Sequence, residues 1–329
     1  HASCVQALVV NGEPASHAVA GDAVQIVLDT TPFYGEGGGQ VGDRGVLSGG
    51  DVIVTVDAVS RMRDVFVHDG RIERGQLAVG DRVNAQVDRT CRRRAQANHT
   101  ATHLLQAALK QVVDPGIGQA GSLVDFDRLR FDFHCPQAVS AEQLVQIETL
   151  INGWIAEAHA LEVQEMAIDQ AKAAGAVAMF GEKYADVVRV VDVPGVSMEL
   201  CGGTHVANTA EIGLFKIVAE SGVAAGIRRI EAVAGASVLA YLNERDSVVK
   251  QLGDRFKAQP GEIVERVVAL QEELKSTGKA LVAAQAELAV AKSAALVSKA
   301  VAAGSCQLLV ERLDGMDGAG LQGAAQSLA

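Results

Sequence analysis

Four residues of metal-ligating types form two closely spaced pairs, His99 with His103 and Cys201 with His205. The first pair lies in a run of strong helix formers. Positions i and i+4 of a helix share one face, so both imidazoles can reach the same point. In the second pair the intervening Gly202–Gly203 frees the backbone to bring thiol and imidazole together. Three imidazoles and one thiolate around a tetrahedral centre suit zinc, so the pairs predict a single zinc site closed by folding.

Two ordinary explanations compete with this prediction. Histidine pairs at this spacing also occur on helix surfaces or as satisfied polar groups in a core, and a single cysteine is commonly a small buried apolar residue. A zinc peptidase is excluded. Its general base would be a glutamate directly after the first histidine, and Thr100 stands there.

The composition bounds the class of protein. A chain of 329 residues with 49% hydrophobic and 4% aromatic residues indicates roughly two to four domains with aliphatic cores. We expect no membrane partner, because no uninterrupted apolar run is long enough to span a bilayer, and no signal peptide is recognisable. The cysteines are odd in number and scattered, which favours a reducing compartment, the cytoplasm: Cys4, Cys91, Cys135, Cys201 and Cys306.

The charge is unevenly distributed. A net charge of −11 argues against a non-specific nucleic-acid binder. However, the stretch from Arg61 to Arg94 holds nine arginines and five acidic residues, a local charge of +4. Arg92–Arg94 directly precede the predicted metal helix, and Arg228–Arg229 form a second cluster. These arginines are either ordinary solvated charge or a phosphate-contacting face beside the metal.

Hydrophobic patterns predict an α+β protein of four parts. Residues 1–90 show short strand-like runs separated by glycine-rich turns, which predicts a small β-barrel. Residues 91–236 read as an α+β domain that contains the zinc site. Its predicted elements are a helix near Arg94–Val113, an alternating strand at Leu129–His134, a helix from the capping box at Ser140 to about residue 160, and strands near Val163–Ala167, Val187–Val193, Gly213–Ala219 and Ile227–Ala234.

Residues 237–304 repeat apolar positions in alternating steps of four and three on both sides of Pro260-Gly261. This predicts an antiparallel helical hairpin of the coiled-coil type. Because the seam is weak at Arg245 and Thr277, a partner-binding helix is the alternative. Residues 305–329 predict a strand, a glycine-rich turn and a helix. These are too few elements to bury a core, so we expect the truncated start of a C-terminal globular domain.

Several segments together resemble alanyl-tRNA synthetases, in particular their C-terminal half. They are Thr31–Asp43, Asn98–Leu105, Leu200–His205, Phe180–Tyr184 and Glu220–Glu231. In that family they belong to the barrel and the editing domain, followed by a helical hairpin and the start of a C-terminal domain. The ATP-dependent aminoacylation domain is not part of these residues. The resemblance therefore implies a fragment, or a free-standing editing protein, that cannot make aminoacyl-tRNA by itself.

The resemblance implies hydrolysis of tRNA(Ala) mischarged with serine or glycine. A pocket sized for alanine cannot exclude these amino acids well, since such differences are worth only about 1–3 kcal/mol. The implied partner is the acceptor end of tRNA(Ala), and a homodimer through the hairpin is a further expectation.

The resemblance also implies roles for individual residues. Thr102, Gln119 and Ser122 would bind the substrate, and Thr102, Gln119 and Cys201 would act in catalysis. Thr102 would form a hydrogen bond with the hydroxyl of a bound serine. The alternative is that the Thr102 hydroxyl lies on the helix face and bonds to the carbonyl four residues earlier. One zinc ion would either be fully ligated by protein and fix the cleft, or keep a position open for water or substrate.

The glycine run at Gly35–Gly39 lacks the Gly-Lys-Ser/Thr ending of a phosphate-binding loop, so we interpret it as a barrel turn that gates the cleft. Two hypotheses compete with the alanyl-type hydrolase. One is a threonyl-tRNA synthetase editing module, which has similar ligand pairs but is disfavoured by Thr31–Asp43 and the hairpin. The other is a non-catalytic tRNA-binding or dimerisation module with a structural metal.

Overall fold

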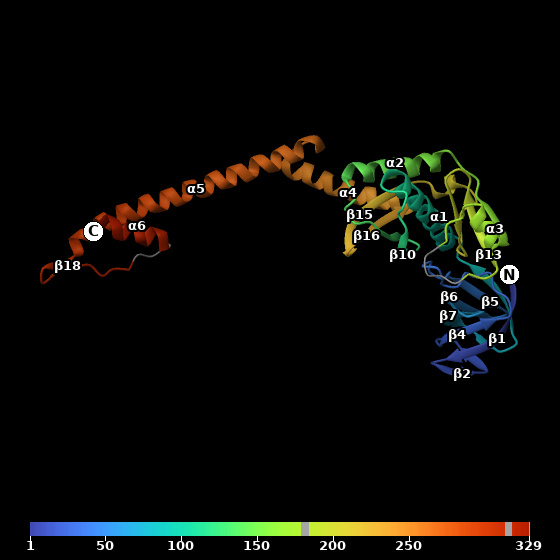
Figure 1. Ribbon diagram of the computed structural model, residues 1–329. Coiled ribbons are helices and arrows are strands. Elements are labelled where there is room, and N and C mark those ends of the chain that lie inside the picture. The colour runs from blue at the N-terminus through green and yellow to red at the C-terminus, as the bar shows by residue number, and fades with distance from the viewer. Residues whose placement is uncertain (179–183, 313–317, 329) are drawn as a thin grey trace. The chain divides into compact units, whose positions relative to one another are not determined.

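The computed structural model describes residues 1–178, 184–312 and 318–328. The chain divides into two compact units, residues 1–242 and residues 243–329 (Figure 1). The first unit contains both predicted ligand pairs. The motif residues 180–183 and the glycine-rich turn at residues 313–317 lie outside the described residues.

The first unit begins with a closed barrel of six antiparallel strands. Their order is β1 (Ala2–Val10), β4 (Ala23–Leu28), β7 (Val65–Arg74), β6 (Val52–Met62), β5 (Gly45–Gly49) and β9 (Arg82–Val87), and β9 pairs again with β1. β2 (Glu13–Ala15) extends the sheet at β1, while β3 (His17–Val19) pairs with β8 (Gln76–Ala78). Alternate side chains point inward, as in β4, where Val24, Ile26 and Leu28 are buried. The predicted barrel is confirmed.

A four-stranded antiparallel sheet and two helices follow. The strand order is β10 (Gln119–Val124), β11 (Leu129–His134), β16 (Ile227–Ala234) and β15 (Phe215–Ala224), and α1 (Arg89–Val112) and α2 (Ala141–Ala156) pack on it. Phe131 and Phe133 of β11 are fully buried in the shared core, as the alternation predicted. The capping box at Ser140 is formed, although α2 ends at Ala156.

A smaller sheet precedes and positions the second ligand pair, Cys201 with His205. It consists of β12 (Glu162–Ala167), β13 (Val187–Val193) and β14 (Ser197–Leu200), with α3 (Ile168–Ala173) packed against it and a 3₁₀ turn at Thr209–Ile212 further on. β14 and α3 were not predicted. β14 matters most, because Cys201 directly follows its last residue.

α1 begins five residues earlier than predicted. The side chain of Asp88 accepts hydrogen bonds from the backbone N–H groups of Thr90 and Cys91 and so caps the helix at Arg89. One turn later, Arg92 forms an ion pair with the buried Asp43 of the barrel. The helix that carries the first histidine pair is thereby fixed to the barrel at its N-terminal end.

The remaining helices are α4 (Ala236–Phe256) and α5 (Ile263–Leu296), with short 3₁₀ turns at Pro260–Glu262 and Val297–Lys299. β17 (Val301–Ala303), β18 (Cys306–Leu308) and α6 (Gly318–Leu328) follow. The predicted helices are present, but their apolar seam is exposed within the chain, for example at Leu270, Leu274 and Leu281. Pairing along this seam stays a prediction. By length and composition alone, the helical segment Pro260–Lys299 could cross a bilayer. This is weak evidence for a membrane-spanning helix, because core helices of soluble proteins pass the same test.

Candidate metal centre and cleft

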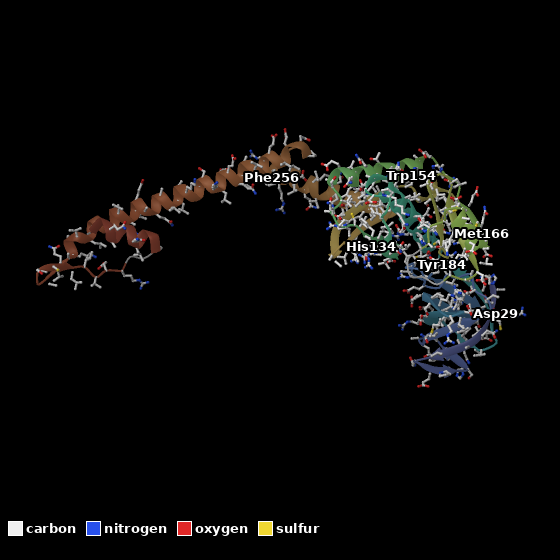
Figure 2. The ribbon with its side chains drawn as sticks, in the orientation of Figure 1. Asp29, His134, Trp154, Met166, Tyr184 and Phe256 are labelled. Carbon is white, nitrogen blue, oxygen red and sulfur yellow. The ribbon has the colours of Figure 1, made fainter. Side chains whose placement is uncertain are left out.

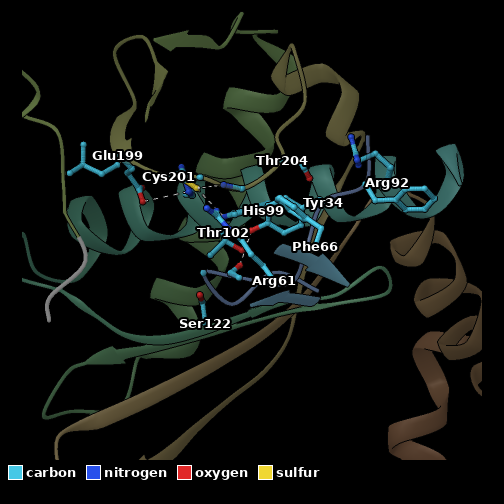
Figure 3. A pocket seen from close by; sticks show the side chains of 18 of the residues that line it. Tyr34, Arg61, Phe66, Arg92, His99, Thr102, Ser122, Glu199, Cys201 and Thr204 are labelled. Carbon is cyan, nitrogen blue, oxygen red and sulfur yellow. Dashed lines mark hydrogen bonds and ion pairs between the residues drawn. The ribbon is translucent and has the colours of Figure 1, made fainter. Parts of the chain in front are cut away.

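The two predicted ligand pairs meet at one point. One ligand atom from each of His99, His103, Cys201 and His205 lies within 4.8 Å of all the others. The Cys201 Sγ is 3.4 Å from the Nε2 of His99 and 3.3 Å from the Nε2 of His205. Figure 3 shows Cys201 beside His99. α1 supplies the first pair from one face, as its spacing predicted, and the loop after β14 supplies the second.

These residues fit a tetrahedral metal such as zinc. Zinc bonds of about 2.0–2.3 Å to nitrogen and sulfur place neighbouring ligand atoms about 3.4–3.6 Å apart, close to the observed separations. The Nδ1 of His103 is buried and has no hydrogen-bond partner among the described residues. A buried polar atom is expected to be satisfied, and a metal bound at this nitrogen would be its partner.

Burial keeps the three imidazoles neutral, which is the form that binds metals. Desolvation lowers the pKa of His99 to about 4, with a further contribution from the positive charge of Arg189. Desolvation also lowers the pKa values of His103 and His205 well below the ordinary value of 6.5, and the neighbouring imidazoles add to the effect. Near neutral pH the site therefore presents nitrogen lone pairs, and protons do not compete for them.

The same shifts predict acid sensitivity of the metal-free protein. The unfolded chain binds protons at these histidines near pH 6.5, whereas the folded chain does so only at much lower pH, so stability falls as the pH drops from 6.5 towards 4. Each histidine contributes up to about 1.4 kcal/mol per pH unit in that window. Urea unfolding at several pH values, in the presence of a chelator, measures this slope.

A matched control is available for the acid prediction. His134 is exposed at the end of β11, so His134→Gln is expected to leave the slope unchanged (Figure 2). His205→Gln removes a buried neutral imidazole and is expected to flatten it. A stability that is constant between pH 6.5 and 5 would contradict the burial of neutral histidines at this centre.

The barrel contributes a buried residue that holds the centre together. The Oε1 of Gln40 accepts hydrogen bonds from the Nδ1 of His99 at 2.7 Å and from the backbone N–H of Thr204 at 2.9 Å, and its Nε2 donates to the Thr204 hydroxyl at 2.8 Å. This fixes His99 as the tautomer whose Nε2 faces Cys201. Gly203 completes the fit, because a Cβ there would lie 2.0 Å from the Cε1 of His99.

Gln40 is therefore expected to set the metal affinity. Outer-shell partners of metal-bound histidines typically change affinity by about 10–100-fold. We expect Gln40→Met to weaken metal binding about tenfold in a chelator competition. Gln40→Glu keeps an oxygen acceptor for His99 and is expected to retain binding. Equal affinities for the methionine variant and the parent would show that this hydrogen bond does not matter.

A cavity of about 500 Å³ opens beside the four ligands, between the barrel and the α+β domain. Thr102, Gln119 and Ser122 all line it, together with three of the four predicted metal ligands (Figure 3). The Nε2 of Gln119 donates to the Ser122 hydroxyl at 3.1 Å. Gly35, Gly37 and Gly38 also line it, so the glycine run faces the cleft, while its gating of the cleft stays a prediction.

The Thr102 hydroxyl makes the helical bond that was named as its alternative. Its Oγ1 donates to the carbonyl of Asn98 at 2.8 Å, and the side chain is buried. A hydroxyl that has given its hydrogen to a carbonyl still carries lone pairs that accept. Thr102 is thus oriented as a hydrogen-bond acceptor in the cavity wall.

Comparisons with known proteins agree with this geometry. Residues 188–231 match the family model of the threonyl and alanyl tRNA synthetase second additional domain, and residues 1–91 match that of the class II (A) tRNA synthetases. The chain is 88% identical over 99% of its length to an alanine–tRNA ligase of Synechococcus sp. strain CC9902. The resemblance to alanyl-tRNA synthetases is confirmed. An alanine–tRNA ligase of Prochlorococcus marinus strain MIT 9303 is 81% identical over 99% of the chain.

The chain spans 37% of the length of these alanine–tRNA ligases. It has the sequence of a fragment of an alanyl-tRNA synthetase with an editing-type domain. Because the family model of that domain covers both alanyl and threonyl enzymes, the His-x3-His and Cys-x3-His pairs do not by themselves separate them. The relatives that match the whole chain distinguish the two types, because they are alanine–tRNA ligases.

Four of the arginines that suggested a phosphate-binding face are held in ion pairs. Arg92 pairs with Asp43 and Arg94 with Asp127. In the second cluster, Arg228 pairs with Glu220 and Arg229 with Asp132. These four arginines therefore have a structural role, whereas Arg61 and Arg63 at the tip of the β6–β7 hairpin are exposed.

Two polar residues of the site were missed in the sequence. Gln40 lies in the quoted glycine-rich segment, yet nothing in its local pattern links it to a histidine 59 positions away. Glu199 is buried with an Oε2 3.7 Å from the Nε2 of His103, and burial raises its pKa to about 8. Near neutral pH this carboxyl is therefore largely protonated, and the contact with neutral His103 is not an ion pair. The position of Glu199 two residues before the predicted ligand Cys201 was the only sequence signal that could have identified it as a site residue.

Proposed function

We propose that this chain hydrolyses the ester bond of tRNA(Ala) mischarged with serine or glycine, and that it does so at a zinc ion. The observation that carries the proposal is the shared cavity, in which ligands of the predicted metal site lie beside Thr102, Gln119 and Ser122. The editing-type domain of the family supports it. The parent activity, ATP-dependent ligation of alanine to tRNA(Ala), would belong to the complete synthetase.

His99, His103, Cys201 and His205 would hold the zinc, which when bound supplies a Lewis acid or fixes the cleft. Gln40 orients His99, and Arg189 binds the backbone carbonyls of Cys201 and Gly203, both at 2.8 Å. The ligand loop is thus preorganised by the protein itself. The catalytic roles that we propose for Gln119 and Cys201 follow from their place in the same cavity wall.

Thr102 supplies the selection step. The serine hydroxyl would donate to its Oγ1, whereas alanine has no hydroxyl and would leave that acceptor unpaired in a buried wall. This bond accounts for the selection of serine only, and release of glycine is expected from the family resemblance alone. The glycine run closes the opposite side and is anchored to β10, because Val124 donates to the Gly39 carbonyl at 2.7 Å and Val41 donates to the Val124 carbonyl at 3.0 Å. Gating by this loop remains part of the proposal.

Deacylation assays test the function. The chain loaded with zinc is incubated with Ser-tRNA(Ala), Gly-tRNA(Ala) and Ala-tRNA(Ala), and the release of each amino acid is followed. We expect release of serine and glycine with alanine largely retained. Release from Ser-tRNA(Thr) alone would assign the threonyl type, and no release from any substrate would overturn the hydrolase.

A non-catalytic module with structural metal is the second candidate. It is favoured by the number of protein ligands, because four donors close a tetrahedral site. In that case tRNA(Ala) binding would persist without hydrolysis, and metal removal would unfold the centre. The exposed apolar seam of α4 and α5 would then serve a homodimer, which sedimentation analysis detects. For either candidate we propose a cytoplasmic location.

A further inference from the structure

One wall of the cavity has a different chemistry from the metal side. Tyr34, Arg61 and Phe66 line it, all from the barrel, and Figure 3 shows them grouped on the side of the pocket away from Glu199. The guanidinium of Arg61 lies 5.6 Å from the centre of the Phe66 ring. We call these three residues the aromatic wall.

From this arrangement we propose that the aromatic wall binds the terminal adenosine of the tRNA by stacking. The inference rests on the proposed function, in which the aminoacyl group lies on the metal side next to Thr102. The ester joins that group to the last ribose, so we place the base in the remainder of the same cavity. Aromatic rings and guanidinium planes are the surfaces on which single-stranded bases stack.

The size of the cavity agrees with an aminoacyl nucleoside. About 500 Å³ lies within the range of about 300–1,000 Å³ that is typical of sites for drug-sized ligands. A free amino acid would leave the barrel side of such a cavity empty. The bare amino acid is therefore a poor match, and the base fills the space that remains.

The wall is held in place before any ligand arrives. Phe66 packs partly against the barrel core, and a Cβ at Gly35 would lie only 2.9 Å from its ring. The backbone N–H of Tyr34 donates to Asp43 at 2.6 Å, and its hydroxyl donates to the Gly37 carbonyl at 2.8 Å. Rigid aromatic surfaces lose little conformational entropy on binding, so they suit a stacking platform.

The neighbouring cavity is the competing location for the base. It measures about 320 Å³, adjoins the first through Gln119 and Glu199, and includes Lys110 and His134. Among its described lining residues there is no phenylalanine, tyrosine or tryptophan. The aromatic wall therefore offers the better stacking surface.

Binding of two probes tests the inference apart from catalysis. The first is 3′-deoxy-3′-(serylamino)adenosine, whose amide resists hydrolysis, and the second is serinamide, which has no nucleoside. Phe66→Leu keeps apolar volume in the barrel but removes the ring. We expect Phe66→Leu and Arg61→Ala to weaken binding of the first probe about tenfold by calorimetry, with serinamide binding and zinc content unchanged.

Matched variants separate stacking from folding. Phe66→Trp keeps an aromatic face and is expected to retain binding, as is Met62→Ala on the exposed tip of the same hairpin. Equal losses for both probes, no loss for either, or a loss confined to Lys110→Met would overturn the inference. Failure of the zinc-loaded parent to hydrolyse Ser-tRNA(Ala), with ring-dependent binding of the adenosine probe intact, would instead overturn the proposed hydrolase and leave the nucleoside site standing.

Discussion

Cys201→Ala is expected to abolish zinc binding at neutral pH and, with it, release of serine from Ser-tRNA(Ala). Cys201 is the only sulfur donor of the four, and its Sγ lies between the Nε2 atoms of His99 and His205. Without it three buried neutral imidazoles remain, and a metal bound by them alone would lose its anionic ligand. Metal analysis by mass spectrometry and single-turnover deacylation measure the two losses separately.

Cys91→Ala is the matched control for that experiment. Cys91 lies in the first turn of α1, is partly exposed, and belongs to no cluster of metal-ligating side chains among the described residues. It is expected to keep both zinc and activity. Should Cys201→Ala lose zinc but still release serine, the metal would have no part in hydrolysis, and the site would be structural.

The sequence was sufficient to predict that these four side chains come together, because the information for each pair is local. His99 and His103 share a helix face, and Cys201 and His205 share a glycine turn, so the geometry of each pair depends on one short segment. What spacing could not show was how the pairs are joined. That depends on β14, a strand of four residues, which is too short to leave an alternating pattern.

The barrel was predicted as a class but not strand by strand. No strand was predicted over β7, which contains Asp69-Gly70, a dipeptide typical of turns. In the structure this glycine lies inside the strand. Only glycine fits there, because a Cβ would lie 2.0 Å from the carbonyl oxygen of Thr55 on β6. The glycine permits two strand backbones to approach closely, and the sequence does not reveal this contact until the strand pairing is known.

Gln40 and Thr102 illustrate a second limit. Gln40 lies within the segment that revealed the family resemblance, yet its hydrogen bond to His99 crosses from the barrel to the α+β domain. The bond from Thr102 to the Asn98 carbonyl was foreseen as the alternative to substrate binding, and it is present, whereas the role of Thr102 toward a substrate stays a prediction. Local sequence can name a polar residue, but the direction of its hydrogen depends on the finished packing.

The Thr102 hydroxyl, which donates to Asn98 and is left to accept, is the basis of the second prediction, which concerns specificity. Thr102→Val keeps the shape of the side chain but removes the acceptor oxygen. We expect the preference for Ser-tRNA(Ala) over Ala-tRNA(Ala) to fall about a hundredfold, because a site that pairs a substrate hydroxyl discriminates far more strongly than one that measures size. Rates of serine and alanine release under single-turnover conditions give the ratio.

Thr102→Ser is the matched control, since it keeps a hydroxyl that can donate to Asn98 and accept from the substrate. It is expected to preserve most of the preference. Zinc content should be the same in both variants, because Thr102 is not among the four predicted ligands. If Thr102→Val kept the full preference for serine, the hydroxyl would be recognised elsewhere in the wall. Ser122 and Gln119, whose side chains are already bonded to each other at 3.1 Å, would be the next residues to test.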